Sequence, residues 1–274
     1  MKTSIAARSL QVLFAYLFAL IALYPILLMI GSSFKTNQQI FANPLSLPTS
    51  FSFKNYAELW EAVPFADFLW NSVIVSVASV LLILLFSAMA AFYIARFSFK
   101  WNGYLYFFFL LGLMIPVKLG IVPLFLLMKK LGLLNSLWSL ILIYTGSGIP
   151  ISVFILTGFL RTLPVQLEEA ARMDGCNNFQ VFWKILLPLV RPALGTVMII
   201  NFIQAWNDFF FPLIFIQKEE LKTIPVGMLS LFGEYEANWS LLFAGLTLSA
   251  LPMIVVFLLA SKQFMEGLTA GAVK

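Results

Sequence analysis

Six long apolar segments follow one another along the chain, separated by short polar stretches. Each contains enough apolar residues to cross the roughly 30 Å hydrocarbon core of a bilayer as a helix. The pattern predicts membrane spans over residues 10–33, 69–95, 103–127, 137–160, 193–216 and 241–261. In lipid, every backbone N–H and C=O group must be hydrogen-bonded within the protein, which a helix achieves by itself. We therefore expect residues 1–274 to form a single all-α membrane domain.

The composition agrees with this class. Of the 274 residues, 61% are hydrophobic and 11% are charged, whereas a soluble domain carries about 25% charged residues. The start of the chain, residues 1–8 followed by the apolar run 10–30, is similar to a signal peptide. That run is longer than a usual signal segment and no Ala-x-Ala site follows it, so we expect a retained first span.

The distribution of Lys and Arg predicts the orientation in the membrane. An even number of spans places both termini on one side, and positive residues are enriched in cytoplasmic loops. The loops on the side of the termini carry Lys2, Arg8, Arg96, Lys100, Arg161, Arg172, Lys184, Arg191, Lys262 and Lys274. The opposite side carries fewer, namely Lys35, Lys54, Lys129, Lys130, Lys218 and Lys222. We therefore expect cytoplasmic termini and a cytoplasmic loop at residues 162–188.

The polar interval 162–188 is predicted to form two short helices. Thr162 is a candidate N-cap for the first helix, with Pro164 in its first turn. Gly175 would end that helix in the left-handed conformation, and Asn177 would cap the second, which Pro188 would end. An apolar stripe follows Leu163, Leu167, Ala170 and Ala171, while Glu168, Glu169 and Arg172 are expected off it. The pattern alone fits either an amphipathic loop on the lipid surface or a docking element.

The same interval carries a resemblance to a known family. Glu169-Ala170-Ala171, three residues, Gly175, nine residues and then Ile185-x-Leu187-Pro188 resembles the EAA loop of importer-type ABC permeases. The resemblance implies the type I ABC importer transmembrane fold, with six transmembrane helices and a cytoplasmic coupling helix that docks on an ATPase subunit. It also implies a location in a bacterial or archaeal cytoplasmic membrane. The residues it assigns to ATPase coupling are Glu168, Glu169, Ala170, Ala171, Asp174, Gly175, Ile185 and Pro188.

Three further stretches resemble the carbohydrate-uptake branch of these permeases, in its maltose-type second subunit. They are the outer segment with Ser33-Phe34-Lys35-Thr36, Pro44 and Asn55-Tyr56, the run Trp206-Asn207-Asp208-Phe209, and the tail Gly267-Leu268-Thr269-Ala270-Gly271-Ala272-Val273-Lys274. The resemblance implies that the tail reaches the ATPase dimer interface, through Thr269, Gly271 and Lys274. Cys176 stands where Ala is more usual in the family, and as a small residue it is not expected to disturb docking.

A polar stripe in the fifth span is the candidate substrate pathway. Asn201, Gln204, Asn207 and Asp208 follow one another at three- and four-residue helical spacing. Sugar hydroxyls need donors and acceptors in place of water, which these side chains supply. The alternative is that they bond to a partner permease. Lys118 is the other ionisable residue expected at membrane depth, and we expect it to extend toward the outer interface.

The sequence also excludes several function classes. It contains no His, no Gly-x4-Gly-Lys-Ser/Thr loop, no His-Glu-x-x-His and no Gly-x-Ser-x-Gly. We therefore expect no catalytic residues, no metal site and no cofactor in this chain, with ATP and Mg bound by partner ATPase subunits. Nucleic acid is not an expected partner, because the basic residues are scattered singly.

The predicted function is that of a permease subunit in an ATP-driven importer of a sugar or oligosaccharide, working by alternating access. The expected partners are a second homologous permease, two ATP-binding subunits and an extracytoplasmic solute-binding protein, with the acidic loop 217–236 as a docking face or merely a solvated loop. Glycerol-phosphate or another polar solute is an alternative cargo, but Lys118 is its one candidate cation, so a neutral sugar is preferred. An ion-coupled secondary carrier is a further alternative, with Asp208 and Lys118 as its available charges.

Overall fold

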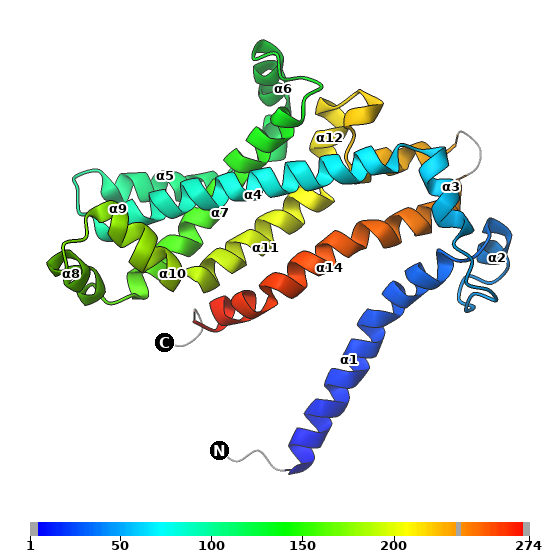
Figure 1. The fold of residues 1–274 in the computed structure, drawn as a ribbon, viewed down its shortest axis with the longest axis horizontal. Coiled ribbons are helices and arrows are strands. Elements are labelled where there is room, and N and C mark those ends of the chain that lie inside the picture. Colours follow the sequence, from blue (N-terminus) through cyan, green and yellow to red (C-terminus); the bar gives the residue numbers. More distant parts are fainter. Residues whose placement is uncertain (1–4, 234–236, 271–274) are drawn as a thin grey trace. The chain divides into compact units, whose positions relative to one another are not determined.

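The computed structural model describes residues 5–233 and 237–270, with side chains over residues 10–233 and 237–262. Within these ranges the chain is helical, and the one β feature is an isolated bridge between Phe232 and Ala237. The expected all-α class is therefore confirmed (Figure 1). Residues 1–66 and 227–251 form one compact unit, and residues 67–226 and 252–274 form a second.

The first unit contains α1 (Ile5–Ser32), α2 (Asn37–Ala42), α3 (Lys54–Ala62) and the beginning of α14 (Trp239–Ala270). Large apolar side chains on all sides of α1 are exposed, including Phe14, Phe18 and Ile21. A helix that is apolar all round matches the solvent properties of lipid, so α1 has the surface of a membrane span.

The segment between α1 and α3 is a compact loop held by buried polar side chains. Asn55 donates from Nδ2 to the carbonyls of Ser33 and Lys35, at 2.7 and 2.9 Å. The Ser33 hydroxyl lies 2.6 Å from the Tyr56 hydroxyl. Lys35 is 1% exposed and donates from Nζ to the carbonyls of Asn43 and Pro44. Residues of the outer-segment resemblance thus contact one another and hold this loop together.

The second unit is built on α4 (Phe65–Arg96, which begins at the end of the first unit), α5 (Asn102–Met114), α7 (Leu137–Thr162) and α11 (Arg191–Asn207). α7 packs between α5 and α11. Gly148 permits the close approach of α7 and α11, since a Cβ there would lie 2.3 Å from Asn201 Oδ1. Gly112 of α5 likewise meets Pro150 of α7 closely.

The third expected span, 103–127, is not one continuous helix. α5 ends at Met114, and a 3₁₀ turn, η1 (Val117–Gly120), leads into α6 (Ile121–Lys130) at a bend of 83°. Ile115 is extended, with φ −85° and ψ 115°. Proline disfavours the helical conformation of the residue before it, so Pro116 explains the break.

The fifth expected span, 193–216, is also interrupted. α11 ends at Asn207, Asp208 is extended, and α12 (Phe210–Phe215) follows. Asp208 Oδ2 accepts a hydrogen bond from the backbone N–H of Phe211 at 3.0 Å. A short polar side chain that bonds nearby backbone competes with helix continuation, which accounts for the interruption. The chain then passes through η3 (Glu219–Leu221), α13 (Ile224–Gly227) and η4 (Met228–Leu231).

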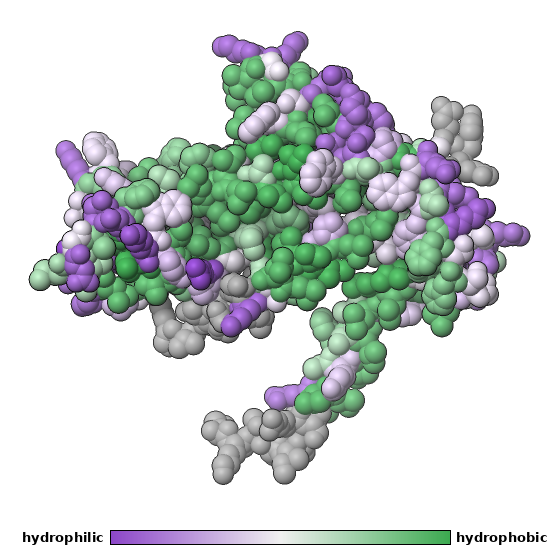
Figure 2. Space-filling view, in the orientation of Figure 1, coloured by the Kyte–Doolittle hydropathy of each residue, from purple (hydrophilic) through white to green (hydrophobic). Residues whose placement is uncertain are grey.

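Within the described residues, four helical segments are long and apolar enough to cross a membrane alone, namely Leu10–Ser32, Phe65–Arg96, Leu137–Thr162 and Trp239–Lys262. The number rises to six if each of two bent helix pairs is one span. Figure 2 shows apolar residues over α1 and α5, and hydrophilic residues gathered around α8 and α9 and at the far end of α6. This distribution suits helices surrounded by lipid with polar ends in water.

Candidate functional site: a coupling element and a polar cavity

Residues 166–189, here called the coupling element, form a polar-tipped hairpin of short helices. They comprise α8 (Gln166–Met173), α9 (Asn178–Gln180), the π-helical turn η2 (Val181–Leu186) and α10 (Leu187–Leu189). Val181, Phe182 and Leu186 are buried against the apolar core of the second unit, together with Ala171 from α8. One side of the element is therefore packed against the second unit, and the other side is exposed.

The first helix of the element begins later than the sequence predicts. Thr162 is the last residue of α7, and its hydroxyl donates to the Phe159 carbonyl at 2.7 Å. Leu163 is extended, and α8 begins at Gln166 after Val165, which makes no side-chain cap. The predicted N-cap role of Thr162 is wrong, because its hydroxyl is satisfied within the preceding helix.

Glu168 and Glu169 have opposite environments, although the sequence placed both off the apolar stripe. Glu169 is exposed, whereas Glu168 is 1% exposed. Arg96, at the end of α4, places Nε 2.5 Å from Glu168 Oε1. Neither atom has a well-aligned hydrogen bond, so this contact is charge against charge. Nothing in the sequence indicated that Glu168 is buried, because its partner Arg96 lies on a different helix, much earlier in the chain.

Two more contacts complete this buried charge cluster. Arg172 Nη2 lies 3.7 Å from Glu168 Oε2, one helical turn along α8. Arg96 Nη2 also donates to the Leu163 carbonyl at 3.1 Å, where the chain leaves α7. Arg96 thus joins the end of α4, the end of α7 and the middle of α8.

The turn between α8 and α9 forms as the sequence predicts. Gly175 has φ +84°, a left-handed conformation that glycine adopts at low cost. The Asn177 side chain accepts from the Gln180 N–H at 2.9 Å, and the Gln180 side chain accepts from the Asn177 N–H at 2.9 Å. This reciprocal capping box fixes the start of α9.

The second helix ends at Leu189, one residue after Pro188 and so close to the end that the sequence predicts. The chain bends by 75° between residues 189 and 191 and then enters α11. The preceding turn, η2, is π-helical, a wide geometry that is frequent at functional positions. Ile185 in this turn is half-buried.

The free side of the coupling element is defined by its exposed residues. Those predicted by the resemblance are Glu169, Ala170, Asp174, Gly175 and Pro188. Met173, at the tip, is 89% exposed, and Phe179 is also exposed. An isolated apolar tip beside a carboxylate has the chemistry of a docking contact, with a large side chain to bury and a charge to pair.

The second candidate site is a cavity of about 500 Å³ within the second unit. Its walls come from the break between α5 and η1, from α7, and from the end of α11. Polar lining residues are Lys118, Tyr144, Ser147, Gln204 and Asp208. A mostly apolar cavity with a few convergent polar groups is the usual form of a small-molecule site.

Asp208 is held in one orientation in this cavity. Oδ2 accepts from the Tyr144 hydroxyl at 2.9 Å and from the Phe211 N–H at 3.0 Å. Oδ1 lies 3.7 Å from Lys118 Nζ, which is also 5.4 Å from the centre of the Phe210 ring. The Lys118 side chain is 63% exposed and also pairs with Asp208, a contact that the sequence did not predict.

The structure divides the predicted polar stripe. Gln204 and Asp208 line the cavity, but Asn201 does not. Asn201 is buried and donates from Nδ2 to Ser152 Oγ at 3.0 Å, which joins α11 to α7. Asn207 is exposed and donates to the Ile203 carbonyl in its own helix at 2.9 Å. Only part of the stripe therefore faces one space, because the α11–α7 contact turns Asn201 toward the core.

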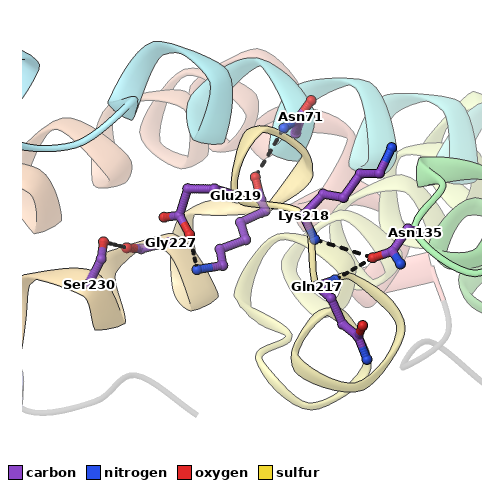
Figure 3. Close-up of polar contacts among 8 residues, drawn as sticks. Asn71, Asn135, Gln217, Lys218, Glu219, Gly227 and Ser230 are labelled. Carbon is purple, nitrogen blue, oxygen red and sulfur yellow. Dashed lines mark hydrogen bonds and ion pairs between the residues drawn. The ribbon is translucent and has the colours of Figure 1, made fainter.

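The loop after α12 is fixed by side chains from elsewhere in the second unit (Figure 3). Asn135, at φ 54°, accepts through Oδ1 from the N–H groups of Gln217 and Lys218. Asn71 donates to the carbonyls of Glu220 and Lys222, and Lys222 pairs with Glu219. The basic and acidic side chains of residues 217–222 therefore stand on an ordered backbone; Glu234 and Glu236 lie outside the described residues.

The tail can be followed only in part. Thr269 lies in the last turn of α14, while Gly271 and Lys274 lie outside the described residues.

Several residues that shape the two sites were not predicted as site residues. They are Arg96, Met173 and Phe179 at the coupling element, and Tyr144 and Ser147 at the cavity. Lys118, which also lines the cavity, was predicted only as a charge for the alternative cargo or carrier. Arg96 and Lys118 are isolated charges beside apolar runs, which was the available signal. Tyr144 and Ser147 are ordinary residues of an apolar helix and gave none.

Known proteins resemble this chain in sequence and in fold. Residues 83–266 match the family model described as binding-protein-dependent transport system inner membrane component. The probable ABC transporter permease protein YurM of Bacillus subtilis is 38% identical over 95% of this chain and 87% of its own length. The arabinooligosaccharides transport system permease protein AraQ of Halalkalibacterium halodurans is 34% identical over 100% of this chain and 99% of its own.

A solved structure shares the fold. The crystal structure of a bacterial ABC transporter involved in the import of the acidic polysaccharide alginate matches with a TM-score of 0.83, at 23% identity, over 96% of this chain and 99% of that chain. The family match covers most of the chain, and full-length relatives exceed 30% identity. The chain therefore belongs to the ABC transporter permeases described as inner membrane components of binding-protein-dependent transport systems.

Proposed function

We propose that this chain is the permease subunit of an importer that moves a sugar or oligosaccharide into the cytoplasm, driven by ATP hydrolysis on separate subunits. The family is one of transporter permeases and the chain is an integral inner-membrane protein. A relative at 34% identity is named as a permease for arabinooligosaccharides, which supports a carbohydrate cargo. The polar cavity of about 500 Å³ has room for part of such a solute.

The observation that carries the proposal is that Glu168 is buried while the adjacent Glu169 is exposed. Glu168 is buried against Arg96 and braces the coupling element from inside. Glu169, Ala170, Asp174 and Gly175 are exposed on the outside of the same element, where an ATPase subunit would dock. Closure of two ATP-binding subunits would then move α8, and Arg96 would carry the displacement to α4 and to the end of α7.

The remaining partners follow from this role. A second homologous permease would complete the pathway, because the cavity in this chain offers few polar side chains for a large solute, namely Lys118, Tyr144, Ser147, Gln204 and Asp208. An extracytoplasmic binding protein would deliver the solute, for which the ordered loop 217–222 offers a docking face. Thr269, Gly271 and Lys274 would contact the ATPase dimer. ATP and Mg would be bound by the ATPase subunits, with both termini of this chain in the cytoplasm.

Co-purification from detergent-solubilised membranes tests the proposal. The native chain should bring down a second permease and an ATPase, whereas Glu169→Lys should release the ATPase and keep the permease. Glu61→Lys is the matched control, because it makes the same charge change at an exposed position outside the coupling element. A native chain that comes down alone and transports in vesicles without ATP would replace this proposal with an ion-coupled carrier.

A further inference from the structure

Lys118 and Asp208 place a balanced pair of charges in the polar cavity. Among the residues that line the cavity, Lys118 and Asp208 are the two that carry a formal charge. Lys118 Nζ and Asp208 Oδ1 lie 3.7 Å apart. The cavity wall thus carries no formal net charge. An unpaired charge at membrane depth is costly, so each of these residues lowers the cost of the other.

The pair still has hydrogen-bonding capacity for a solute. Asp208 Oδ2 already accepts from Tyr144 and Phe211, which leaves Oδ1 as the freer acceptor. Lys118 Nζ has three N–H donors, and 3.7 Å to Oδ1 is longer than a normal hydrogen bond. Gln204 on the same wall adds an amide that both donates and accepts. A hydroxyl group could insert at this pair and bond to both charges at once.

We infer that Lys118 and Asp208 are specificity-determining residues, which admit an uncharged polyhydroxy solute and exclude a carboxylated or phosphorylated one. The inference deepens the proposed function and rests on it. An anionic group that approaches Lys118 must also approach Asp208, which Tyr144 and the Phe211 N–H prevent from turning away. Like charges in a cavity of low polarity repel strongly, whereas a neutral hydroxyl meets one donor and one acceptor.

The fold does not decide this question. The solved structure with the same fold belongs to a transporter of an acidic polysaccharide, at 23% identity. The charge of the accepted solute is therefore not set by the fold, and in this chain the one lysine that lines the cavity is neutralised by a fixed carboxylate.

The test measures the electrostatic potential of the cavity without needing the natural solute. Cys176 is the chain's single cysteine, so Cys176→Ser gives a thiol-free chain. Ser147→Cys or Gln204→Cys then places one thiol in the cavity wall. Membrane vesicles that contain the whole transporter are treated with two methanethiosulfonates of similar size, one ending in a neutral hydroxyethyl group and the other in an anionic sulfonatoethyl group. The ratio of the anionic to the neutral rate reports the local potential.

Asp208→Asn should raise this ratio about fivefold, because Lys118 is then unbalanced, and Lys118→Met should lower it by a similar factor. The double variant should return to the ratio of the starting chain. Asparagine is close in shape to aspartate and keeps an acceptor for Tyr144 and Phe211, so the fold of the cavity is retained. Glu220→Gln and Lys130→Met make the same charge changes outside the cavity lining and should leave the ratio unchanged.

Two results would overturn the inference. One is a ratio that does not respond to Asp208→Asn or Lys118→Met. The other is that neither thiol reacts with the neutral reagent, with or without ATP, since the cavity would then be closed to polar solutes. Failure of the proposed function would appear separately, as loss of the ATPase partner in the co-purification, which does not depend on these labelling rates.

Discussion

Arg96 Nε, at the end of α4, lies 2.5 Å from Glu168 Oε1 in the middle of α8. The two side chains are 5% and 2% exposed, so this is a buried ion pair. A buried pair contributes little net stability compared with apolar residues of equal size, but loss of one partner leaves an uncompensated charge. The pair is thus well suited to hold one element in a fixed relation to another, which is what a coupling element requires.

Removal of one member of this pair should destabilise the protein. For Arg96→Gln we expect a cost of about 3 kcal/mol, reduced below that of a fully isolated charge because Arg172 remains 3.7 Å from Glu168. The measurement is the apparent melting temperature of the purified complex in detergent, together with recovery of the ATPase. The double variant Arg96→Gln/Glu168→Gln should regain most of the loss, and Arg191→Gln, at an exposed position, should have little effect. Equal melting temperatures for the single and double variants would show that the charges are not coupled.

Gly148 should not tolerate a side chain. A Cβ there would lie 2.3 Å from Asn201 Oδ1 and 2.5 Å from Ile83 Cδ1, so Gly148→Ala must push α7 away from its neighbours. Overpacking of this kind costs about 1–3 kcal/mol. Gly146→Ala is the matched control in the same helix, because its Cβ would meet nothing within 4 Å. Comparison of the two melting temperatures checks this packing, and a similar value for both would contradict the close approach of α7 and α11.

Asn201 should act in packing and Asn207 should not. Asn201 is buried and joins α11 to α7 by donating to Ser152. Asn201→Ala should therefore lower the free energy of unfolding by about 1–3 kcal/mol, because Ser152 loses this hydrogen bond and a cavity is left. Asn207→Ala removes an exposed side chain that donates to the Ile203 carbonyl of its own helix and makes only a weak contact, at 3.8 Å, to the Met253 sulfur, so it should be near neutral. A double-mutant cycle of Asn201→Ala with Ser152→Ala, read from thermal unfolding, should show a coupling energy. Additive effects would mean that the hydrogen bond is not formed.

Gly175 should be needed for its backbone conformation alone. At φ +84° an alanine is strained by about 1–2 kcal/mol, although a Cβ there would meet nothing within 4 Å. Gly175→Asn should cost less, because asparagine adopts the left-handed conformation more readily. Both variants are compared by melting temperature and ATPase recovery with Gly158→Ala, a helical glycine whose Cβ would also meet nothing within 4 Å. Alanine at position 175 should lower the melting temperature more than asparagine does. Equal effects of the two substitutions would mean that the presence of any side chain, rather than backbone strain, is the cause.

Local features of the coupling element could be predicted from the sequence because their causes lie within a few residues. The left-handed turn at Gly175 and the capping box of Asn177 with Gln180 depend on backbone preferences and on side chains three positions away. The prediction for Thr162 failed because its hydroxyl can cap the following helix or bond within the preceding one, and here it donates to the Phe159 carbonyl.

The sequence by itself determined the class of this protein, the order of its apolar segments and the position of the coupling element. These follow from the hydrophobicity of whole segments and from local turn chemistry, which do not require knowledge of neighbours. The tertiary structure alone decided that Glu168 faces Arg96, that Lys118 pairs with Asp208 and that Asn201 bonds to α7 rather than lining the cavity. Helices in lipid are apolar on every side, so their sequence does not show which face meets which helix. Small residues such as Gly148, and the few polar groups that must find partners, select those contacts only when the helices come together.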